Sequence, residues 1–414
     1  MTEEIFSTLA DLKESARHLA LVPAAQRSEA LRHMAEQLLL CRKDILLANE
    51  KDRQQAEEEK LSRSRINILT ISEKDIQAMA DFFLRVADYE DPVGKLLDEE
   101  IRENLRREKR LQPLGVVAMV YEARPSVITD CAALCMRSGN ALLLRGSSHC
   151  SRTDEVIVET LRGALELADI PFNAITRIEG DHELNYELAK QDRYIDLMIL
   201  RGGYGCLEDI RRQATVPVIG AGPGNCHIYI DESAKPEMAL SIVHNSKVPR
   251  PLACNAAETI LVNRKWAEEH LRTITDMLVE NGITIRGSAE VCELFSGVEL
   301  AEEADWEREF FASTVAVKLV EDVQEAVCHI NCYRTPHTEC IITENEANAR
   351  YFQSFVEANV VCWNASTRLT DGMEFGMGGE MGISTQKYPV GGPIGINHLM
   401  QQKYYLTGNG TLRQ

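Results

Sequence analysis

The sequence lacks any apolar run long enough to cross a membrane. A spanning helix needs about 20 consecutive apolar residues, and no stretch reaches that length. The N-terminal segment MTEEIFSTLADLKESARHL is acidic and polar, so it also lacks the basic start and apolar stretch of a signal peptide. These absences predict a cytoplasmic protein with no membrane partner.

The chain is also poor in basic residues relative to acidic ones. It has 45 Lys and Arg against 64 Asp and Glu, which gives a net charge of −19. A general nucleic-acid binder would carry a basic patch or a high pI, so the charge balance argues against that class. An anionic small-molecule substrate would need a local cluster of Arg and Lys against this background.

No CxxC pair or dense cysteine framework is present among the twelve cysteines. Cys131 and Cys135, and likewise Cys328 and Cys332, are four residues apart, which places each pair on one face of a helix. Neither pair is accompanied by the second ligand pair of a zinc site, so no metal is predicted. Reduced, mostly buried thiols are the expectation, although one of them can still be reactive.

The sequence does contain continuous apolar strands that alternate with helices. Its 414 residues suit two or three domains. Strands are predicted at 116–121, 141–145, 174–178 and 195–200, with helices between them. This alternation predicts an α/β fold with a doubly wound parallel sheet, which binds its ligands at the carboxyl ends of the strands.

A second α/β run begins after IYIDES (228–233). It is predicted to hold a helix at 236–244 and an irregular segment at 245–257, followed by further strands and helices. From about residue 99, alternating charged and apolar residues that end in Pro-Leu-Gly predict an exposed hairpin or arm. The C-terminal YYLTGNGTL is a candidate strand to pair with that arm.

The segment NSKVPRPLACNAAETILVN is the most informative for chemistry. Cys254 follows a predicted loop that holds two prolines and the cations Lys247 and Arg250, and a strand follows it. Nearby cations lower the pKa of a thiol and make it nucleophilic. The alternative is that Cys254 is a buried small apolar residue, as most cysteines are.

Two glycine loops follow predicted strands and lead into helices: RGSS (145–148) and RGGYG (201–205). Backbone N–H groups at such helix starts suit phosphates, although neither loop is GxGxxG and a plain turn is the alternative. GAGPGNCH (220–227) is typical of a backbone that approaches a ligand closely, and a turn explains it nearly as well.

Two further segments carry candidate binding residues. YEARP ends the first strand with Glu122 and Arg124, and an arginine there can hold a carboxylate or phosphate, or form a surface ion pair. WNASTRLTDGMEFGMGGEMGISTQK brings Ser366, Thr367 and Arg368 into a long polar loop. Such loops are often functional, and a disordered surface loop is the alternative.

These segments, in this order, resemble the gamma-glutamyl phosphate reductase family of the aldehyde dehydrogenase superfamily. The resemblance runs from about residue 5 to the C-terminus, and YEARP, RPxxCN and NASTRxTDGxEFG together are specific. It implies a cofactor-binding domain (1–98 and 114–232), a catalytic domain (233–365) and an oligomerisation arm with a C-terminal segment (99–113 and 366–414). It also implies a homo-oligomer.

The resemblance implies NADPH-dependent reduction of L-glutamyl 5-phosphate to glutamate 5-semialdehyde, the second step of proline biosynthesis. Superfamily members that oxidise aldehydes need a Glu base, and Gly220 stands near that place here. Glutamate 5-kinase, which would channel the substrate, is a candidate partner. The alternatives are a related acyl-phosphate or acyl-CoA reductase, or a catalytically silent homologue. The retained Cys254, glycine loops and Glu309 argue against the silent homologue.

The resemblance assigns roles residue by residue. Cys254 matches the nucleophile, and Asn255 with nearby backbone N–H groups is a candidate oxyanion donor, because the superfamily's oxyanion asparagine would fall near Ala123. The cofactor residues are Arg145, Gly146, Ser147 and Ser148 at the adenosine ribose, Gly202 and Gly203 over the pyrophosphate, and Glu309 at the nicotinamide ribose. The candidates for a multiply anionic substrate are Arg124, Lys247, Arg250, Ser366, Thr367 and Arg368.

The expected cofactor, NADPH rather than NADH, follows from the resemblance, because Arg145 suits either a 2′-phosphate or a 2′-hydroxyl. The chain departs from the family at two places: Pro249 replaces a frequent Gln, and Gly391 replaces a frequent Arg. The first could shift the loop before Cys254. The second removes a cation that could reach the substrate or a neighbouring subunit.

Overall fold

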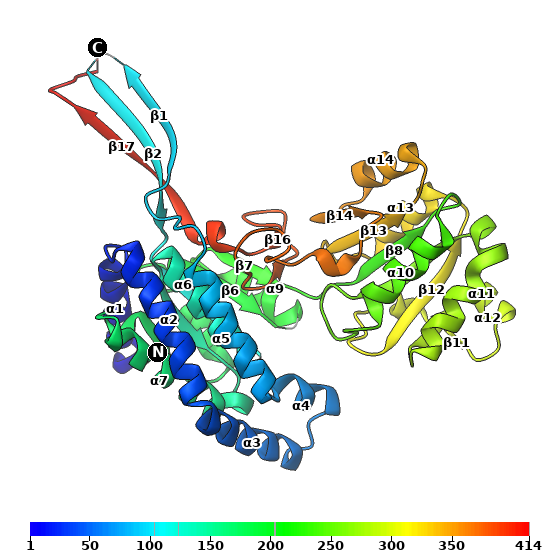
Figure 1. Cartoon of the computed structure of the whole chain (residues 1–414), viewed down its shortest axis with the longest axis horizontal. Helices are drawn as coiled ribbons and strands as arrows, with labels where there is room; N and C mark the ends of the chain where they lie inside the picture. The colour runs from blue at the N-terminus through cyan, green and yellow to red at the C-terminus, as the bar shows by residue number, and fades with distance from the viewer. Residues whose placement is uncertain (103, 123, 203, 414) are drawn as a thin grey trace. The chain divides into compact units, whose positions relative to one another are not determined.

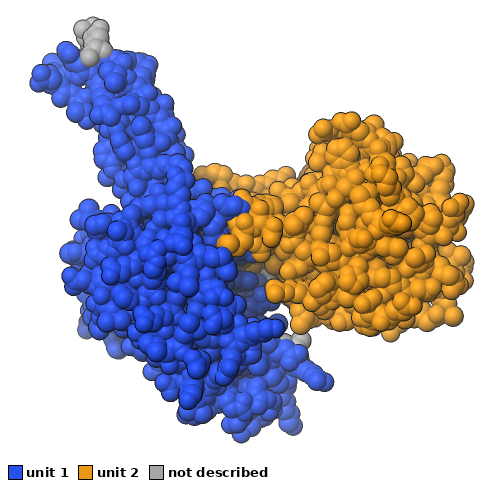
Figure 2. Space-filling view, viewed as in Figure 1, with its two compact units in different colours: residues 1–220, 376–382, 394–414 blue, residues 221–375, 383–393 orange. Residues whose placement is uncertain are grey.

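The computed structural model describes residues 1–102, 104–122, 124–202 and 204–413. The chain divides into two compact units (Figures 1 and 2). Unit 1 comprises Met1–Gly220, Gly376–Gly382 and Ile394–Gln414, and unit 2 comprises Ala221–Phe375 and Ile383–Pro393. No helix in the described ranges is long and apolar enough to cross a bilayer.

Unit 1 is built on a five-stranded sheet in the order β5-β4-β3-β6-β7. Its strands are β3 (Val116–Tyr121), β4 (Ala141–Arg145), β5 (Ile175–Arg177), β6 (Leu197–Arg201) and β7 (Val218–Ala221). The pairs among β5, β4, β3 and β6 are parallel. The strands predicted from apolar runs are confirmed, because both faces of these strands are buried.

Some helices of unit 1 pack on its sheet, and others pack on those helices. They are α1 (Glu3–Leu19), α2 (Ala24–Leu40), α3 (Arg42–Glu58), α4 (Arg63–Leu69), α5 (Glu73–Ala87), α6 (Ser126–Ser138), α7 (Ser151–Leu167), α8 (His182–Leu188) and α9 (Tyr204–Gln213). Leu9 and Leu12 of α1, spaced for one helical face, pack against Val116 and Ala118 of β3. α6 ends where Gly139 takes a left-handed conformation, with φ of 74°.

A separate three-stranded antiparallel sheet belongs to unit 1 and extends from its body (Figure 1). It consists of β1 (Leu96–Arg102), β2 (Leu105–Pro113) and β17 (Met400–Gly408). β17 runs along the whole of β2, from Met400 opposite Pro113 to Gly408 opposite Leu105. The predicted pairing of the arm with the C-terminal tail is therefore confirmed.

Unit 2 contains a seven-stranded sheet in the order β11-β10-β12-β9-β8-β13-β14, and its pairs are parallel. The strands are β8 (Cys226–Ile230), β9 (Ala257–Asn263), β10 (Thr284–Gly287), β11 (Glu299–Leu300), β12 (Thr314–Val320), β13 (Thr338–Ile342) and β14 (Val360–Trp363). Successive residues enter different cores: Ile228 and Ile230 pack on one face and Tyr229 on the other. Both faces are thus covered, as a doubly wound sheet requires.

The helices of unit 2 are α10 (Pro236–Lys247), α11 (Arg264–Glu280), α12 (Ala289–Leu294), α13 (Val323–Tyr333) and α14 (Glu346–Phe355). A short β15–β16 ladder (Ile383–Ser384 and Gly392–Pro393) and the 3₁₀ turn η4 (Thr367–Leu369) complete the unit.

Two expectations from the sequence differ from this structure. β8, expected at the end of the cofactor domain, pairs with β9 and β13 of the second sheet. Lys247, expected in a loop, is the last residue of α10.

Candidate functional site

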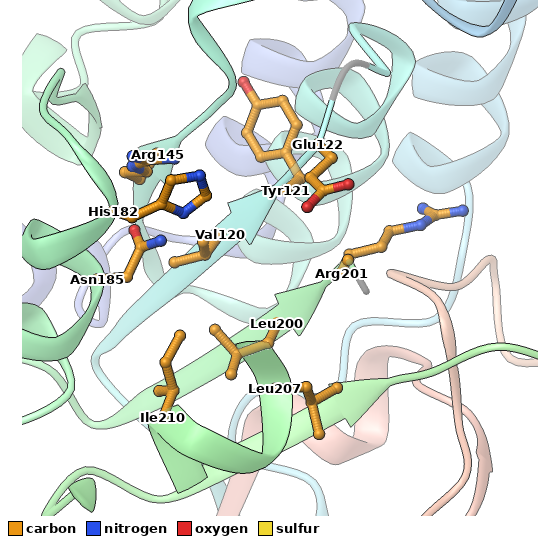
Figure 3. Close-up of a pocket in the computed structure, with 11 residues that line it drawn as sticks. Val120, Tyr121, Glu122, Arg145, His182, Asn185, Leu200, Arg201, Leu207 and Ile210 are labelled. Atoms are coloured by element: carbon orange, nitrogen blue, oxygen red, sulfur yellow. The ribbon is translucent and has the colours of Figure 1, made fainter. Parts of the chain in front are cut away.

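A pocket in unit 1 lies at the carboxyl ends of β3 and β6, where parallel sheets bind their ligands (Figure 3). About 360 Å³ of space lies within it, part of which is open solvent. Figure 3 shows the apolar side chains of Leu200, Leu207 and Ile210 at one edge, and His182 and Asn185 of α8 at another. An apolar slot with a few polar groups at its rim suits a flat ring such as a nucleotide base.

Arg145, the last residue of β4, also lines this pocket, but its guanidinium is engaged with the backbone. Nη2 donates to the carbonyl oxygens of Gly180 and Asp181 at 2.9 and 2.7 Å, and Nη1 donates to that of Gly146 at 3.3 Å. These bonds fix the start of α8 against the end of β4. The predicted contact of Arg145 with a ribose would be made from this fixed position.

The loop after β4 rests on a buried carboxylate, Asp154 of α7. Its Oδ2 accepts hydrogen bonds from the Tyr121 hydroxyl at 2.8 Å and from the Cys150 thiol at 3.4 Å. Burial raises the pKa of Asp154 to about 7, against the lowering effect of these two bonds. A Cβ on Gly146 would lie 2.3 Å from Asp154 Oδ2, so glycine is what lets the loop lie this close.

The predicted serines of this loop differ in their surroundings. The Ser147 hydroxyl accepts a hydrogen bond from the His149 backbone N–H at 3.3 Å and caps the 3₁₀ turn η1 (Ser148–Cys150). Ser148 is exposed. Ser148 is therefore the more accessible of the two candidates for a ligand's phosphate.

Gly202 follows β6 and lines the pocket, and its place over a pyrophosphate stays a prediction. A Cβ at this position would come within 3.2 Å of Glu122 Oε1. Arg124 lies in the same unit, half-buried two residues before α6, and its carbonyl oxygen accepts from the Val127 N–H at 3.0 Å. Gly203 and Ala123, named in the sequence analysis, lie outside the described residues.

Sequence reasoning missed His182 and Asn185 as pocket residues. Their segment, GDHELN, carries no glycine-rich or catalytic motif. The signal that could have found them is positional: α8 follows β5, so its first turn lies at the carboxyl end of a parallel strand.

Cys254 belongs to unit 2 and lies half-buried in the loop between α10 and β9. The backbone of the GAGPGNCH segment packs against it: a Cβ on Gly224 would lie 1.8 Å from the Cys254 carbonyl oxygen. The Cys226 thiol donates to that same oxygen at 3.5 Å. The close backbone approach expected here is therefore made by Gly224 to the protein's own cysteine loop.

Asn255, the residue after the cysteine, is 5% exposed and holds a neighbouring turn. Its Nδ2 donates to the carbonyl oxygens of Thr370 at 2.9 Å and Arg368 at 3.4 Å, and its own carbonyl accepts from the Thr367 hydroxyl at 2.7 Å. Both amide protons are thus directed at the backbone, which corrects the expectation of a side-chain oxyanion donor. Within the described part of the chain, the backbone N–H of Asn255 has no acceptor, so it remains the candidate donor.

The predicted substrate residues of the 366–368 loop are mostly occupied inside unit 2. The Ser366 hydroxyl lies 2.9 Å from that of Ser246, which also accepts from the Thr367 N–H at 3.3 Å. Thr367 is fully buried, so its side chain supports the cysteine loop rather than facing a ligand. Arg368 is half-buried and is the remaining substrate candidate of the three.

The two cations near Cys254 have opposite environments. Lys247 is fully buried, and its Nζ lies 3.0 Å from Oε2 of Glu258, which is also buried. Burial lowers the pKa of Lys247 and raises that of Glu258 to about 7. Arg250 is exposed and available to an anion. Lys247, by contrast, is placed inside the core, which corrects the expectation of a substrate contact.

Glu309 lies half-buried in an irregular segment between η3 (Glu303–Asp305) and β12, within unit 2. The next residue but one, Phe311, has φ of 48°, a left-handed conformation that bulky residues rarely adopt. The Phe310 N–H donates to Glu258 Oε2 at 3.3 Å. Glu309, Lys247 and the Cys254 loop are thus brought together in one unit.

Two glycines singled out by the resemblance, Gly220 near the place of the superfamily's base and Gly391 at a family departure, lie close to neighbouring side chains. A Cβ on Gly220 would lie 2.4 Å from the Leu207 side chain. A Cβ on Gly391 would lie 2.6 Å from Asn359 Oδ1, whose amide donates to the Ser384 carbonyl at 2.8 Å. A larger residue at either place would need its neighbour to move. Pro249 is exposed.

The cysteine pairs considered for zinc also fall into two classes. Cys131 and Cys135 are buried in α6, and burial raises the pKa of both thiols, which disfavours the thiolates that bind metals. Cys328 and Cys332 are exposed on α13. Among the described residues, no group of three or more His, Cys, Asp or Glu is arranged to hold a metal ion.

Comparison with known proteins places this architecture. Residues 2–282 match the aldehyde dehydrogenase family. The gamma-glutamyl phosphate reductase of Bacillus velezensis is 44% identical over 415 residues, covering 99% of each chain. The crystal structure of the enzyme of that name from Thermotoga maritima superposes with a TM-score of 0.93 at 38% identity, with both chains fully covered. A glyceraldehyde-3-phosphate dehydrogenase from Methanocaldococcus jannaschii, complexed with NADP, shares the fold at a TM-score of 0.71 and 14% identity, covering 98% of this chain and 94% of its own.

Two parallel α/β units, one with glycine loops at its strand ends and one with a loop cysteine, define an oxidoreductase of the aldehyde dehydrogenase class. Within that class, the chain belongs to the gamma-glutamyl phosphate reductase family. The fold and family expected from the sequence are therefore confirmed.

Proposed function

We propose that this protein reduces L-glutamyl 5-phosphate to L-glutamate 5-semialdehyde with release of phosphate, the second step of proline biosynthesis. The observation that carries the proposal is Cys254, half-buried in a loop fixed by Gly224, Cys226 and the Asn255 network, in a chain 44% identical over its length to a reductase of that name. A loop held this firmly keeps a nucleophile in one position, as covalent catalysis requires.

The residues of unit 2 act on the acyl group. The Cys254 thiolate attacks the acyl carbon, a carbon–sulfur bond forms, and the bond to the phosphate oxygen breaks. The phosphate is already a good leaving group, so no strong acid is needed. The backbone N–H of Asn255 would stabilise the oxyanion, and Arg250 and Arg368 would bind the anionic groups of the substrate.

The pocket of unit 1 would hold the adenosine half of the cofactor. Its apolar edge at Leu200 and Ile210 suits the base, and the backbone of Gly202, which lines the same pocket, would lie beside the phosphates. When bound, NADPH supplies the hydride that reduces the thioester to the aldehyde. Gly220 stands near the place of the superfamily's base and has no side chain to activate water, which favours phosphate as the acyl acceptor in the reverse direction.

The three-stranded sheet of unit 1 is our candidate for contact with a second copy of the chain. Its strands expose apolar side chains that a second copy could cover: Ile101 is 70% exposed and Leu406 is 66% exposed. Channelling of substrate from glutamate 5-kinase and localisation in the cytoplasm remain predictions from the sequence.

The proposal is tested by phosphate-dependent oxidation of glutamate 5-semialdehyde, measured with NADP and with NAD. We expect activity with NADP that needs inorganic phosphate. Cys254→Ala should lower the rate by at least about 10³-fold while NADPH binding is retained. Arsenate resembles phosphate and should affect a reaction that uses phosphate. An oxidation that does not respond to arsenate, or that needs coenzyme A in place of phosphate, would favour the related acyl-CoA reductase instead.

A further inference from the structure

The buried ion pair of unit 2 needs an explanation other than stability. Lys247 is 0% exposed and Glu258 is 1% exposed, with Nζ and Oε2 3.0 Å apart. Taking both charges out of water costs as much as their attraction returns, so an apolar pair of the same size would often be as stable. A buried pair that does not stabilise the fold is expected to fix the position of something else.

The pair touches the segment that carries Glu309. The Glu258 oxygen that faces Lys247 also accepts the Phe310 N–H at 3.3 Å. This segment has no regular helix or strand, so few backbone bonds define its path. The hydrogen bond therefore joins the end of α10 and the start of β9 to the residue directly after Glu309.

The backbone beside Glu309 is strained, and strain of this kind persists only where the surroundings impose it. Phe311 has φ of 48°, which costs a non-glycine residue free energy relative to an ordinary conformation. The Glu258 carboxylate is the buried group that binds the neighbouring Phe310 N–H. The segment is thus held in a shape that it would not adopt alone.

Lys247 also acts directly on both acids. The charges of Glu258 and of Glu309 both raise the pKa of Lys247, against the effect of burial, so the ammonium lies within electrostatic reach of each. Two carboxylates in one buried region would repel each other. The Lys247 ammonium, within reach of both acids, offsets part of that repulsion.

We propose that the Lys247–Glu258 ion pair positions the 308–311 segment, so that Glu309 is held ready for the nicotinamide ribose of the cofactor. Lys247 and Glu258 are then positioning residues, and Lys247 is not a substrate ligand. The inference rests on the proposed function only in taking the cofactor to be a nicotinamide dinucleotide.

The test compares Lys247→Met/Glu258→Leu with wild type by direct titration of NADPH fluorescence and by steady-state kinetics. The double variant removes both charges together, whereas either single variant leaves a buried charge without its partner and is expected to unfold more readily. We expect the double variant to keep a melting temperature close to that of wild type. Its NADPH affinity should fall about tenfold, while the KM for glutamate semialdehyde changes less than twofold.

A double-mutant cycle with Glu309→Gln identifies the route of the effect. If the pair acts through Glu309, adding Glu309→Gln to the double variant should weaken NADPH binding by less than a further twofold. Lys265→Met/Glu232→Leu, which removes an exposed pair 3.0 Å apart in the same unit, should bind NADPH like wild type. Wild-type NADPH affinity in the double variant, or losses that add fully with Glu309→Gln, would overturn the positioning role. A wild-type protein that binds no NADPH would overturn the proposed function as well.

Discussion

Gly146 of unit 1 and Gly224 of unit 2 both lie where a Cβ would collide, but they collide with different things. At Gly146 the nearest atoms belong to the side chains of Asp154 and Tyr121, at 2.3 and 2.8 Å. At Gly224 the nearest atom is the carbonyl oxygen of Cys254, at 1.8 Å. Side chains can rotate or shift, whereas a backbone carbonyl moves only with its loop. The cysteine loop is therefore the less tolerant of the two.

The buried acids of the two units also differ in how well their surroundings tolerate a change. Asp154 of unit 1 accepts hydrogen bonds from two neutral groups, a phenol and a thiol. Glu258 of unit 2 accepts one from the cation Lys247. Protonation of Asp154 breaks no ion pair, while protonation of Glu258 would leave a buried ammonium unbalanced. The surroundings of Asp154 in unit 1 therefore tolerate protonation of the acid, whereas those of Glu258 in unit 2 do not.

The largest effect is expected from Gly224→Ala. The added methyl group must push the Cys254 carbonyl away, and a displacement of about 1 Å at a nucleophile lowers a rate by about 100-fold. Steady-state kinetics should show this loss mainly in kcat, with NADPH affinity within twofold of wild type. A variant with normal kcat would remove the basis for the comparison of the two loops.

Asp154→Asn tests the buried acid of unit 1 through pH. The pKa rises from 3.8 to about 7 on folding, so the folded chain binds the extra proton, and the stability from this group is full below pH 4 and lost as pH rises through 7. The amide cannot titrate. Relative to wild type, the variant's free energy of unfolding should therefore improve by about 2–3 kcal/mol between pH 5 and pH 8.

Urea unfolding followed by circular dichroism at several pH values measures this difference. Glu159→Gln, on the same helix but 61% exposed, is the matched control and should shift little with pH. A difference between Asp154→Asn and wild type that stays constant from pH 5 to pH 8 would mean that Asp154 is ionised throughout this range.

The sequence pattern was sufficient to predict the parallel sheets, because their strands are buried on both faces and therefore appear in the sequence as continuous apolar runs. For Cys254 the local pattern left a buried, inert thiol as the alternative, and its role as nucleophile, which rests on the resemblance of RPLACN to the family motif, stays a prediction. The boundary between the units was misplaced, since β8 is as apolar as the strands of either sheet and its partners, β9 and β13, come later in the chain. Which sheet a strand joins depends on such partners, which can lie far away in the sequence.

The local environment of charged and polar residues could not be predicted. Lys247 and Arg250 are three residues apart, yet one is buried against Glu258 and the other is exposed. Asn255 is adjacent to the nucleophile, yet its side chain binds the backbone at Thr370. Residue type and spacing reveal that a cation or an amide is near a cysteine, but its partners come from segments far away in sequence.

Gly146→Ala measures the tolerance of the loop on the cofactor side. The methyl group would meet Asp154 and Tyr121, whose side chains can yield by a small shift, so the loop should move less than the cysteine loop does in Gly224→Ala. We expect the KM for NADPH to rise about tenfold with kcat changed less than threefold. A loss in kcat equal to that of Gly224→Ala would erase the difference between the two loops.

The smallest effect, and of opposite sign, is expected from Gly163→Ala. Gly163 lies in α7, the helix that carries Asp154, but it is exposed and a Cβ there would meet nothing within 4 Å. Alanine is the better helix former and loses less chain entropy on folding, so the free energy of unfolding should rise by about 0.5–1 kcal/mol. Kinetic constants should stay at wild-type values. Since the substitution is the same at all three glycines, a loss of stability here would show that collisions of the Cβ do not explain the losses at Gly146 and Gly224.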